Sequence, residues 1–103
     1  MAVKEITGAE FEEEVIKSDV PVIVDFKAEW CGPCKVLKST VEEIAEERAD
    51  VKVVSVDIDE EEDLVDEYEV FSIPCLVAFK GGSEVGRSIG LASKSEIYGA
   101  LGL

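Results

Sequence analysis

The sequence predicts an α/β domain in which helices cover both faces of a mixed central β-sheet. Apolar, β-branched segments alternate along the chain with segments whose apolar residues recur at helical spacing. One segment, residues 20–26, is apolar on both alternations, which is typical of a central strand covered on both sides. Two late segments flank the pair Gly81–Gly82, which indicates a hairpin and therefore an antiparallel pair of strands.

The first two predicted elements are a short strand and a helix. Residues 2–6 alternate weakly between apolar and polar side chains, as a short edge strand does. Thr7 and Glu10 then have the spacing of a capping box. Phe11 and Val15 supply an i, i+4 apolar pair to the helix that follows.

A central strand then leads into the second helix. Residues 20–26 form the strand, and Asp25 is the one charged side chain within it. The helix is expected to begin near residue 31, because apolar residues recur from there at helical spacing. These residues are Cys34, Leu37, Val41, Ile44 and Ala45.

The second half of the chain continues the alternation and adds the hairpin. Residues 51–58 are rich in β-branched side chains and indicate a strand. Asp59 and Glu62 have capping spacing for a third helix. Residues 73–79 and 85–89 predict the two strands of the hairpin.

A last helix completes a single domain. Ser93 and Glu96 have the spacing of a second capping box, and Ile97 and Leu101 are apolar residues of the helix that it opens. The order of elements is therefore βαβαβαββα, with parallel crossovers first and the antiparallel hairpin last. No linker or repeat divides the chain, so residues 1–103 are expected to form one domain.

Composition excludes several classes of function. The 24 acidic residues outnumber the 10 basic ones and give a net charge of −14, so a phosphate backbone or an anionic membrane would repel the chain. We therefore expect no nucleic-acid and no membrane partner. The absence of histidine removes Ser-His and Cys-His catalysis and histidine metal sites. The first residues contain no apolar run of signal-peptide length, which favours a reducing, cytoplasmic setting.

Cys31 and Cys34 stand three residues apart where the second helix is predicted to begin. Both therefore lie on one side of its first turn, close enough to form a disulfide. Cys31 is nearest the unpaired N–H groups and the positive end of the helix dipole, which favour a thiolate, so it is predicted to attack. Cys34, deeper on the apolar stripe, is predicted to resolve the mixed disulfide. Pro33 is tolerated in a first turn, and Gly32 leaves the backbone open to approach.

Metal binding is the main alternative for this cysteine pair. A zinc or iron–sulfur site needs about four ligands, and Cys75 is the only further cysteine, so such a site would have to form across a dimer. The acidic run from Asp57 to Asp63 invites calcium, but it lacks the required glycine and has Tyr68 where a glutamate is needed. We expect no metal. A non-catalytic binding module is disfavoured because both cysteines are present.

Asp25 is the anomalous residue of the central strand. A carboxylate inside a doubly covered strand loses its hydration, so its pKa is expected to rise and it can exchange protons near neutral pH. The alternative is an aspartate at the end of a strand that simply reaches water.

Over essentially its whole length the chain resembles the thioredoxin family. The matching segments are Val24 to Phe26, Ala28 to Lys35, Val56 to Asp59, Ile73-Pro74, Phe79 to Gly82, and Gly90. The resemblance implies the thioredoxin fold and a general protein-disulfide reductase that takes part in electron transport and cell redox homeostasis. It also implies disulfide-containing substrate proteins and a thioredoxin reductase, dependent on NADPH or on ferredoxin, that recycles the protein. We expect a monomer whose redox-active disulfide needs no cofactor.

The resemblance further implies roles for residues around the pair. Asp25 matches the family's buried carboxylate, which manages the proton of the resolving cysteine. Pro74 matches a cis-proline whose loop, including Ile73, presents backbone groups to the substrate chain. Trp30 matches a tryptophan that contacts partners, with simple packing as the alternative. Gly90 matches a glycine at a place where a side chain would obstruct docking.

Five positions depart from the family pattern. Lys27 stands in place of a second tryptophan, and Ser55 replaces a lysine usually close to the buried carboxylate. Ser39 replaces a mid-helix proline, so the sequence lacks the residue that would kink the second helix. Ser72 and Cys75 replace a glycine before the cis-proline and a threonine after it.

Lys27 and Cys75 are the departures most able to modulate the site. The ammonium of Lys27 is expected either to favour the Cys31 thiolate or to extend past apolar surface into water. Cys75 is expected to be a buried, inert thiol, with a regulatory third thiol as the alternative.

Overall fold

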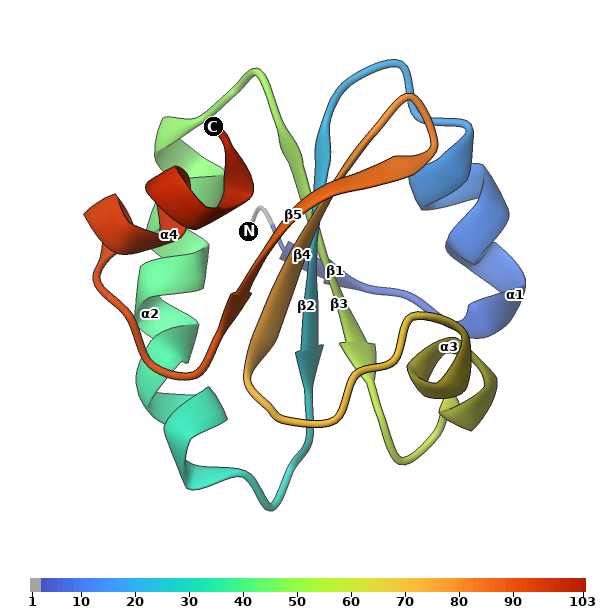
Figure 1. Ribbon diagram of the computed structural model, residues 1–103, viewed down its shortest axis with the longest axis horizontal. Helices are drawn as coiled ribbons and strands as arrows, with labels where there is room; N and C mark the ends of the chain where they lie inside the picture. Colours follow the sequence, from blue (N-terminus) through green and yellow to red (C-terminus); the bar gives the residue numbers. More distant parts are fainter. Residues whose placement is uncertain (1–2) are drawn as a thin grey trace.

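The computed structural model describes residues 3–103, and its elements follow the predicted order of strands and helices (Figure 1). The predicted first strand also included Ala2, which lies outside the described residues. The elements are β1 (Val3–Glu5), α1 (Gly8–Phe11), the π-helical turn η1 (Glu12–Ile16), β2 (Val22–Lys27), α2 (Gly32–Glu47), β3 (Lys52–Asp57), α3 (Glu62–Glu67), β4 (Cys75–Lys80), β5 (Ser83–Ile89) and α4 (Lys94–Leu101).

The strands form one mixed sheet in the order β1-β3-β2-β4-β5. Strands β1 and β2 both pair with β3 in parallel, whereas β4 pairs antiparallel with β2 and β5. Figure 1 shows α2 and α4 on one side of the sheet and α1 and α3 on the other. The predicted fold class, a mixed sheet with helices on both faces, is therefore confirmed.

Side chains of the central strand β2 alternate between two cores, as its double apolar pattern predicted. Val22, Val24 and Phe26 belong to the core shared with residues of α1 and α3. Ile23 belongs to the core shared with α2 and α4. Since successive odd-numbered residues of this strand share a face, Asp25 and Lys27 follow Ile23 on the side covered by α2.

Two of the predicted helix caps are present. At α4, the N–H of Glu96 donates to Ser93 Oγ at 3.1 Å, and the N–H of Ser93 donates to Glu96 Oε1 at 2.8 Å. At α1, the N–H of Thr7 donates to Glu10 Oε1 at 2.9 Å. Both pairs satisfy backbone donors that a helix start leaves without an intrahelical partner.

The predicted cap of the third helix is wrong. Helix α3 is preceded by Glu61, and no side chain caps it. The N–H of Asp59 instead donates to Asp57 Oδ1 at 2.9 Å, which makes a local turn after β3. The bond from Asp59 N–H to Asp57 holds Asp59 in this turn, so Asp59 does not cap a helix as its spacing suggested.

Other boundaries differ by a few residues. The first predicted helix is α1 followed by η1, whose wider turn is closed by the N–H of Lys17 donating to the carbonyl of Glu12 at 2.9 Å. Strand β4 begins at Cys75 rather than at residue 73, because Pro74 has no N–H to give to a ladder. Helix α2 is continuous through Ser39.

The chain changes from β2 to α2 at one end of the sheet, and the other functional loops gather there. In Figure 1 this junction lies at the same end as the loops from β3 to α3, from α3 to β4, and from β5 to α4. Residues far apart in the sequence therefore meet around the start of α2.

Candidate active site

Cys31 and Cys34 occupy the first turn of α2 as a disulfide, with their Cα atoms 5.2 Å apart. Cys31 is the residue before the helix and has an extended backbone, and its sulfur accepts the N–H of Cys34 at 3.1 Å. A sulfur at this place receives a helix-terminal N–H and the positive end of the dipole, both of which favour a thiolate. Pro33 fits the first turn, because an N–H at this position would have no intrahelical acceptor and its absence costs no hydrogen bond.

The two sulfur-bearing residues lie in a small apolar pocket of their own. Cys31, Cys34 and Ala28 form a buried cluster, against which Ile58 and Ile73 pack. Ile73 comes from the segment before β4, and this contact confirms that the segment lies beside the cysteines. Cys31 and Cys34 are 4% and 9% exposed, so this apolar surrounding keeps most water away from their side chains.

Three loop residues frame the pair. The Ile73–Pro74 peptide bond is cis, and the N–H of Gly90 donates to the carbonyl of Pro74 at 2.8 Å. Gly90 has φ +86°, a conformation that favours glycine, and a Cβ there would meet no atom within 4 Å. Gly32 is equally open. A backbone approaching the cysteines would therefore meet no side chain at either glycine.

Trp30 is an exposed aromatic residue directly before the pair. Its side chain is 67% exposed, so packing is not its main role. Its indole N–H donates to Asp59 Oδ2 at 2.8 Å, which fixes the orientation of the ring. Sequence reasoning did not find this partner, because the bond joins two loops 29 residues apart.

Asp25 lies on the α2 side of β2, between Ser55 of β3 and Leu76 of β4. Its side chain is half-buried and lines a cleft of about 420 Å³ that Cys34 also lines. Burial raises the pKa of Asp25 from its ordinary value of 3.8 to about 6, and the positive charge of Lys27 opposes the rise. The pKa of Asp25 is therefore raised in the direction that the sequence predicted, and the cleft connects this carboxylate with Cys34.

Lys27 lies at the end of β2 and lines the same cleft. Its ammonium is 2.9 Å from Glu5 Oε1 on the edge strand β1. Burial is the largest single effect and lowers the pKa of Lys27, but the bond to Glu5 and the charges of Glu5, Asp57 and Glu29 together outweigh it, so the pKa is raised. Sequence analysis associated this ammonium with Cys31, and the contact that the structure gives it is with Glu5.

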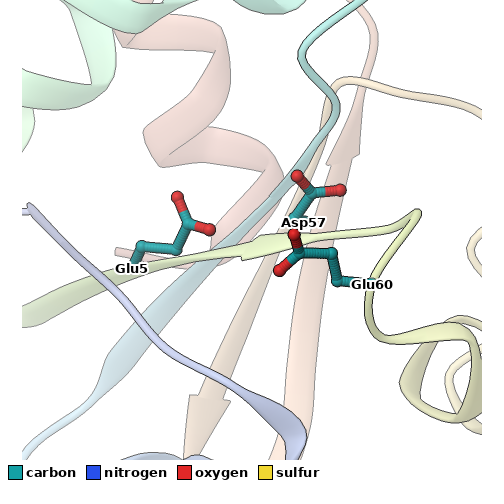
Figure 2. A group of neighbouring side chains, drawn as sticks. All are labelled: Glu5, Asp57 and Glu60. Atoms are coloured by element: carbon teal, nitrogen blue, oxygen red, sulfur yellow. The ribbon is translucent and has the colours of Figure 1, made fainter.

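A group of three carboxylates lies next to this ion pair. Glu5, Asp57 and Glu60 come from β1, from β3 and from the loop after β3, and their oxygens lie within 4.8 Å of one another (Figure 2). Lys27 pairs with one of the three and thereby offsets part of their mutual repulsion. Only the parallel pairing of β1 with β3 brings Glu5 to this place, so its involvement escaped sequence analysis.

Cys75 is buried in the core on the other side of the sheet. It opens β4, is 1% exposed, and belongs to the same cluster as Phe26 and Val70. Burial raises the pKa of this thiol. Both its burial and its raised pKa favour the protonated thiol over the reactive thiolate.

We expect iodoacetamide to leave Cys75 of the oxidised protein unmodified until denaturant is added. Cys31 and Cys34 are blocked in that state, so mass spectrometry reports on Cys75 alone. Cys75→Thr is expected to leave reductase activity intact. Rapid labelling of the native protein would contradict the buried position and make Cys75 a candidate regulatory site.

Two thiols on one helical turn can close to a disulfide by giving an electron pair to a disulfide in another molecule. A protein built around that exchange is a thiol–disulfide oxidoreductase. The family model described as Thioredoxin matches residues 2–101, so the chain belongs to the thioredoxin family. It is accordingly a protein-disulfide reductase.

Similar proteins in distant organisms agree with this assignment. The thioredoxin of Pyropia yezoensis is 43% identical over 102 residues, which cover 98% of this chain and 95% of that protein. The thioredoxin of Rickettsia typhi is 47% identical over 96 residues, covering 92% of this chain and 91% of its own length. Thioredoxin 1 of a Nostoc species is 42% identical over 97 residues, covering 93% and 91%.

Proposed function

We propose that Cys31 attacks substrate disulfides and that Cys34 resolves the mixed disulfide. The N–H of Cys34, which lies 3.1 Å from the sulfur of Cys31 at the start of α2, carries this assignment. In the first step the Cys31 thiolate bonds to one sulfur of the substrate, and the substrate's other sulfur leaves as a thiolate. In the second step Cys34 sulfur bonds to Cys31 sulfur, and the substrate's remaining sulfur leaves. The substrate gains two electrons, and the protein is left as the Cys31–Cys34 disulfide.

Asp25 is proposed to take the proton of Cys34 in the second step. A thiol must lose its proton before its sulfur becomes a nucleophile, and a carboxylate with a pKa of about 6 is an effective acceptor near neutral pH. The cleft that both residues line gives the proton a path.

The substrate-binding surface is proposed to consist of the loops around the sulfur atoms. Trp30 supplies an exposed aromatic face. Gly32 and Gly90 leave room for a main chain to approach. Pro33, Ile73 and Pro74 complete the surface. Such a mixture of backbone and apolar side chains suits an extended segment of a substrate protein.

A reducing compartment such as the cytoplasm is the proposed setting, because a disulfide reductase works where an electron supply keeps thiols reduced. We further propose that residues 1–103 act as one monomeric domain in electron transport, with no cofactor beyond the redox pair. The family match over residues 2–101 supports the single domain. The net charge of −14 disfavours nucleic acid and anionic membranes as partners. No helix of residues 3–103 has the length and hydropathy needed to cross a membrane.

A reductase assay tests this proposal. The oxidised protein is mixed with an NADPH-dependent or a ferredoxin-dependent thioredoxin reductase, and insulin-disulfide reduction is followed. We expect one reductase to support multiple turnovers. Failure of both, together with failure of dithiothreitol-reduced protein to reduce insulin, would contradict the proposal.

A further inference from the structure

Asp25 and Lys27 are neighbours on one face of β2. Side chains two residues apart in a strand point to the same side, and both of these line the cleft under α2. Ser55, the residue directly across from Asp25 in β3, is uncharged. The positive charge that acts on Asp25 comes from Lys27, on the same strand.

The ammonium of Lys27 is held in place rather than free in solvent. Its side chain is only 19% exposed, and Glu5 Oε1 lies 2.9 Å from it. Glu5 belongs to β1, on the far side of β3 from Lys27, so this ion pair spans one strand of the sheet. A cation fixed in a half-buried cleft acts on its neighbours far more strongly than a solvated one.

The other charged groups of the cleft are placed differently. Helix α2 contributes Lys35 and Lys38, both exposed, so their charges are screened by water and salt. The anions that face this region are Glu5 from β1, Glu29 before α2, Glu42 from α2, Asp57 from β3 and Glu60 from the loop after β3. The remaining titratable groups are the thiols of Cys34 on α2 and of Cys75, whose side chain lies across the sheet.

We propose that Lys27 is a positioning residue whose ammonium, tethered by Glu5, keeps Asp25 ionised for the step in which Cys34 resolves the mixed disulfide. This proposal rests on the role given to Asp25 above. Burial favours the protonated carboxyl, which cannot accept a proton. The fixed positive charge favours the carboxylate and so enlarges the fraction of molecules ready for the second step at neutral pH.

The test is the titration of Asp25 in the oxidised protein, followed by carbonyl ¹³C NMR. We expect Lys27→Met to raise the titration midpoint by on the order of one pH unit, as the loss of a unit charge from the same face of the strand implies. Lys27→Arg is expected to restore the wild-type midpoint. Lys38→Met removes an exposed cation from the same cleft and is expected to leave the midpoint unchanged.

The same variants are compared in pH profiles of insulin reduction. Lys27→Met is expected to shift the acidic limb of the profile to higher pH by a similar amount. In an Asp25→Asn background, Lys27→Met is expected to leave the position of that limb unchanged. An unchanged NMR midpoint in Lys27→Met, or an equal shift in Lys38→Met, would overturn the proposal. A third outcome is that Lys27→Met shifts the NMR midpoint but moves the acidic limb equally with and without Asp25→Asn. That result would support the effect of Lys27 on Asp25 and refute the proton-accepting role of Asp25.

Discussion

Cys31→Ser is expected to abolish insulin-disulfide reduction, whereas Cys34→Ser is expected to trap covalent complexes with substrate proteins. Serine at position 31 removes the nucleophile that starts the exchange. Serine at position 34 leaves the attack possible but removes the sulfur that displaces the substrate. Non-reducing gel electrophoresis after mixing with a disulfide-containing protein detects the trapped species.

A doubly substituted protein, Cys31→Ser with Cys34→Ser, provides the matched control and is expected to form no complex. Cys75 remains in all three variants, so any complex formed by the double variant would reveal a third reactive thiol. Sustained turnover by Cys34→Ser without a trapped species would refute the assignment of roles.

Asp25→Asn is expected to stabilise the fold, by more at pH 8 than at pH 5, and to slow disulfide exchange. With a pKa of about 6 in the folded protein, against an ordinary 3.8, the folded carboxyl keeps its proton where the unfolded chain has released it. The wild type therefore loses stability as pH rises from about 4 to about 6, and the full cost of ~3 kcal/mol is present above that range. About half of that cost is present at pH 5. Asparagine does not ionise and removes the pH-dependent cost.

Urea unfolding of the oxidised protein at the two pH values measures this difference. Asp66→Asn, which changes an exposed carboxylate on α3, is the matched control and is expected to show no comparable pH-dependent gain. Equal stabilisation by Asp25→Asn at pH 5 and pH 8 would argue against a buried carboxylate with a raised pKa.

The sequence predicted the features of this fold that depend on neighbouring residues. Helix α4 follows from Ser93 and Glu96, because a capping box forms within a single turn. The start of α2 at the cysteine pair follows from the spacing of its apolar stripe. The fold class and the redox pair were therefore predictable, as was the burial of Asp25.

Features that depend on strand pairing were not predictable in the same way. The contact of Lys27 with Glu5 exists because β1 and β2 both pair with β3, a fact that no local pattern contains. The misplaced start of α3 has a local cause, since the spacing of Asp59 did not indicate that Asp57 would take its N–H. An aspartate side chain can accept a hydrogen bond from a nearby backbone N–H in a turn as well as at a helix start, so its spacing alone does not decide between the two.

The separation of Cys75 from the Cys31–Cys34 pair sets the electron stoichiometry that we expect of the molecule. Cys75 is packed beside Phe26 and its pKa is raised, so we expect it not to compete with Cys34 for the bond to Cys31. Oxidation is then expected to give a single product, the Cys31–Cys34 disulfide, without intramolecular exchange into Cys75. Each molecule is expected to accept one electron pair from its donor and to deliver one pair to its substrate, although the chain has three cysteines.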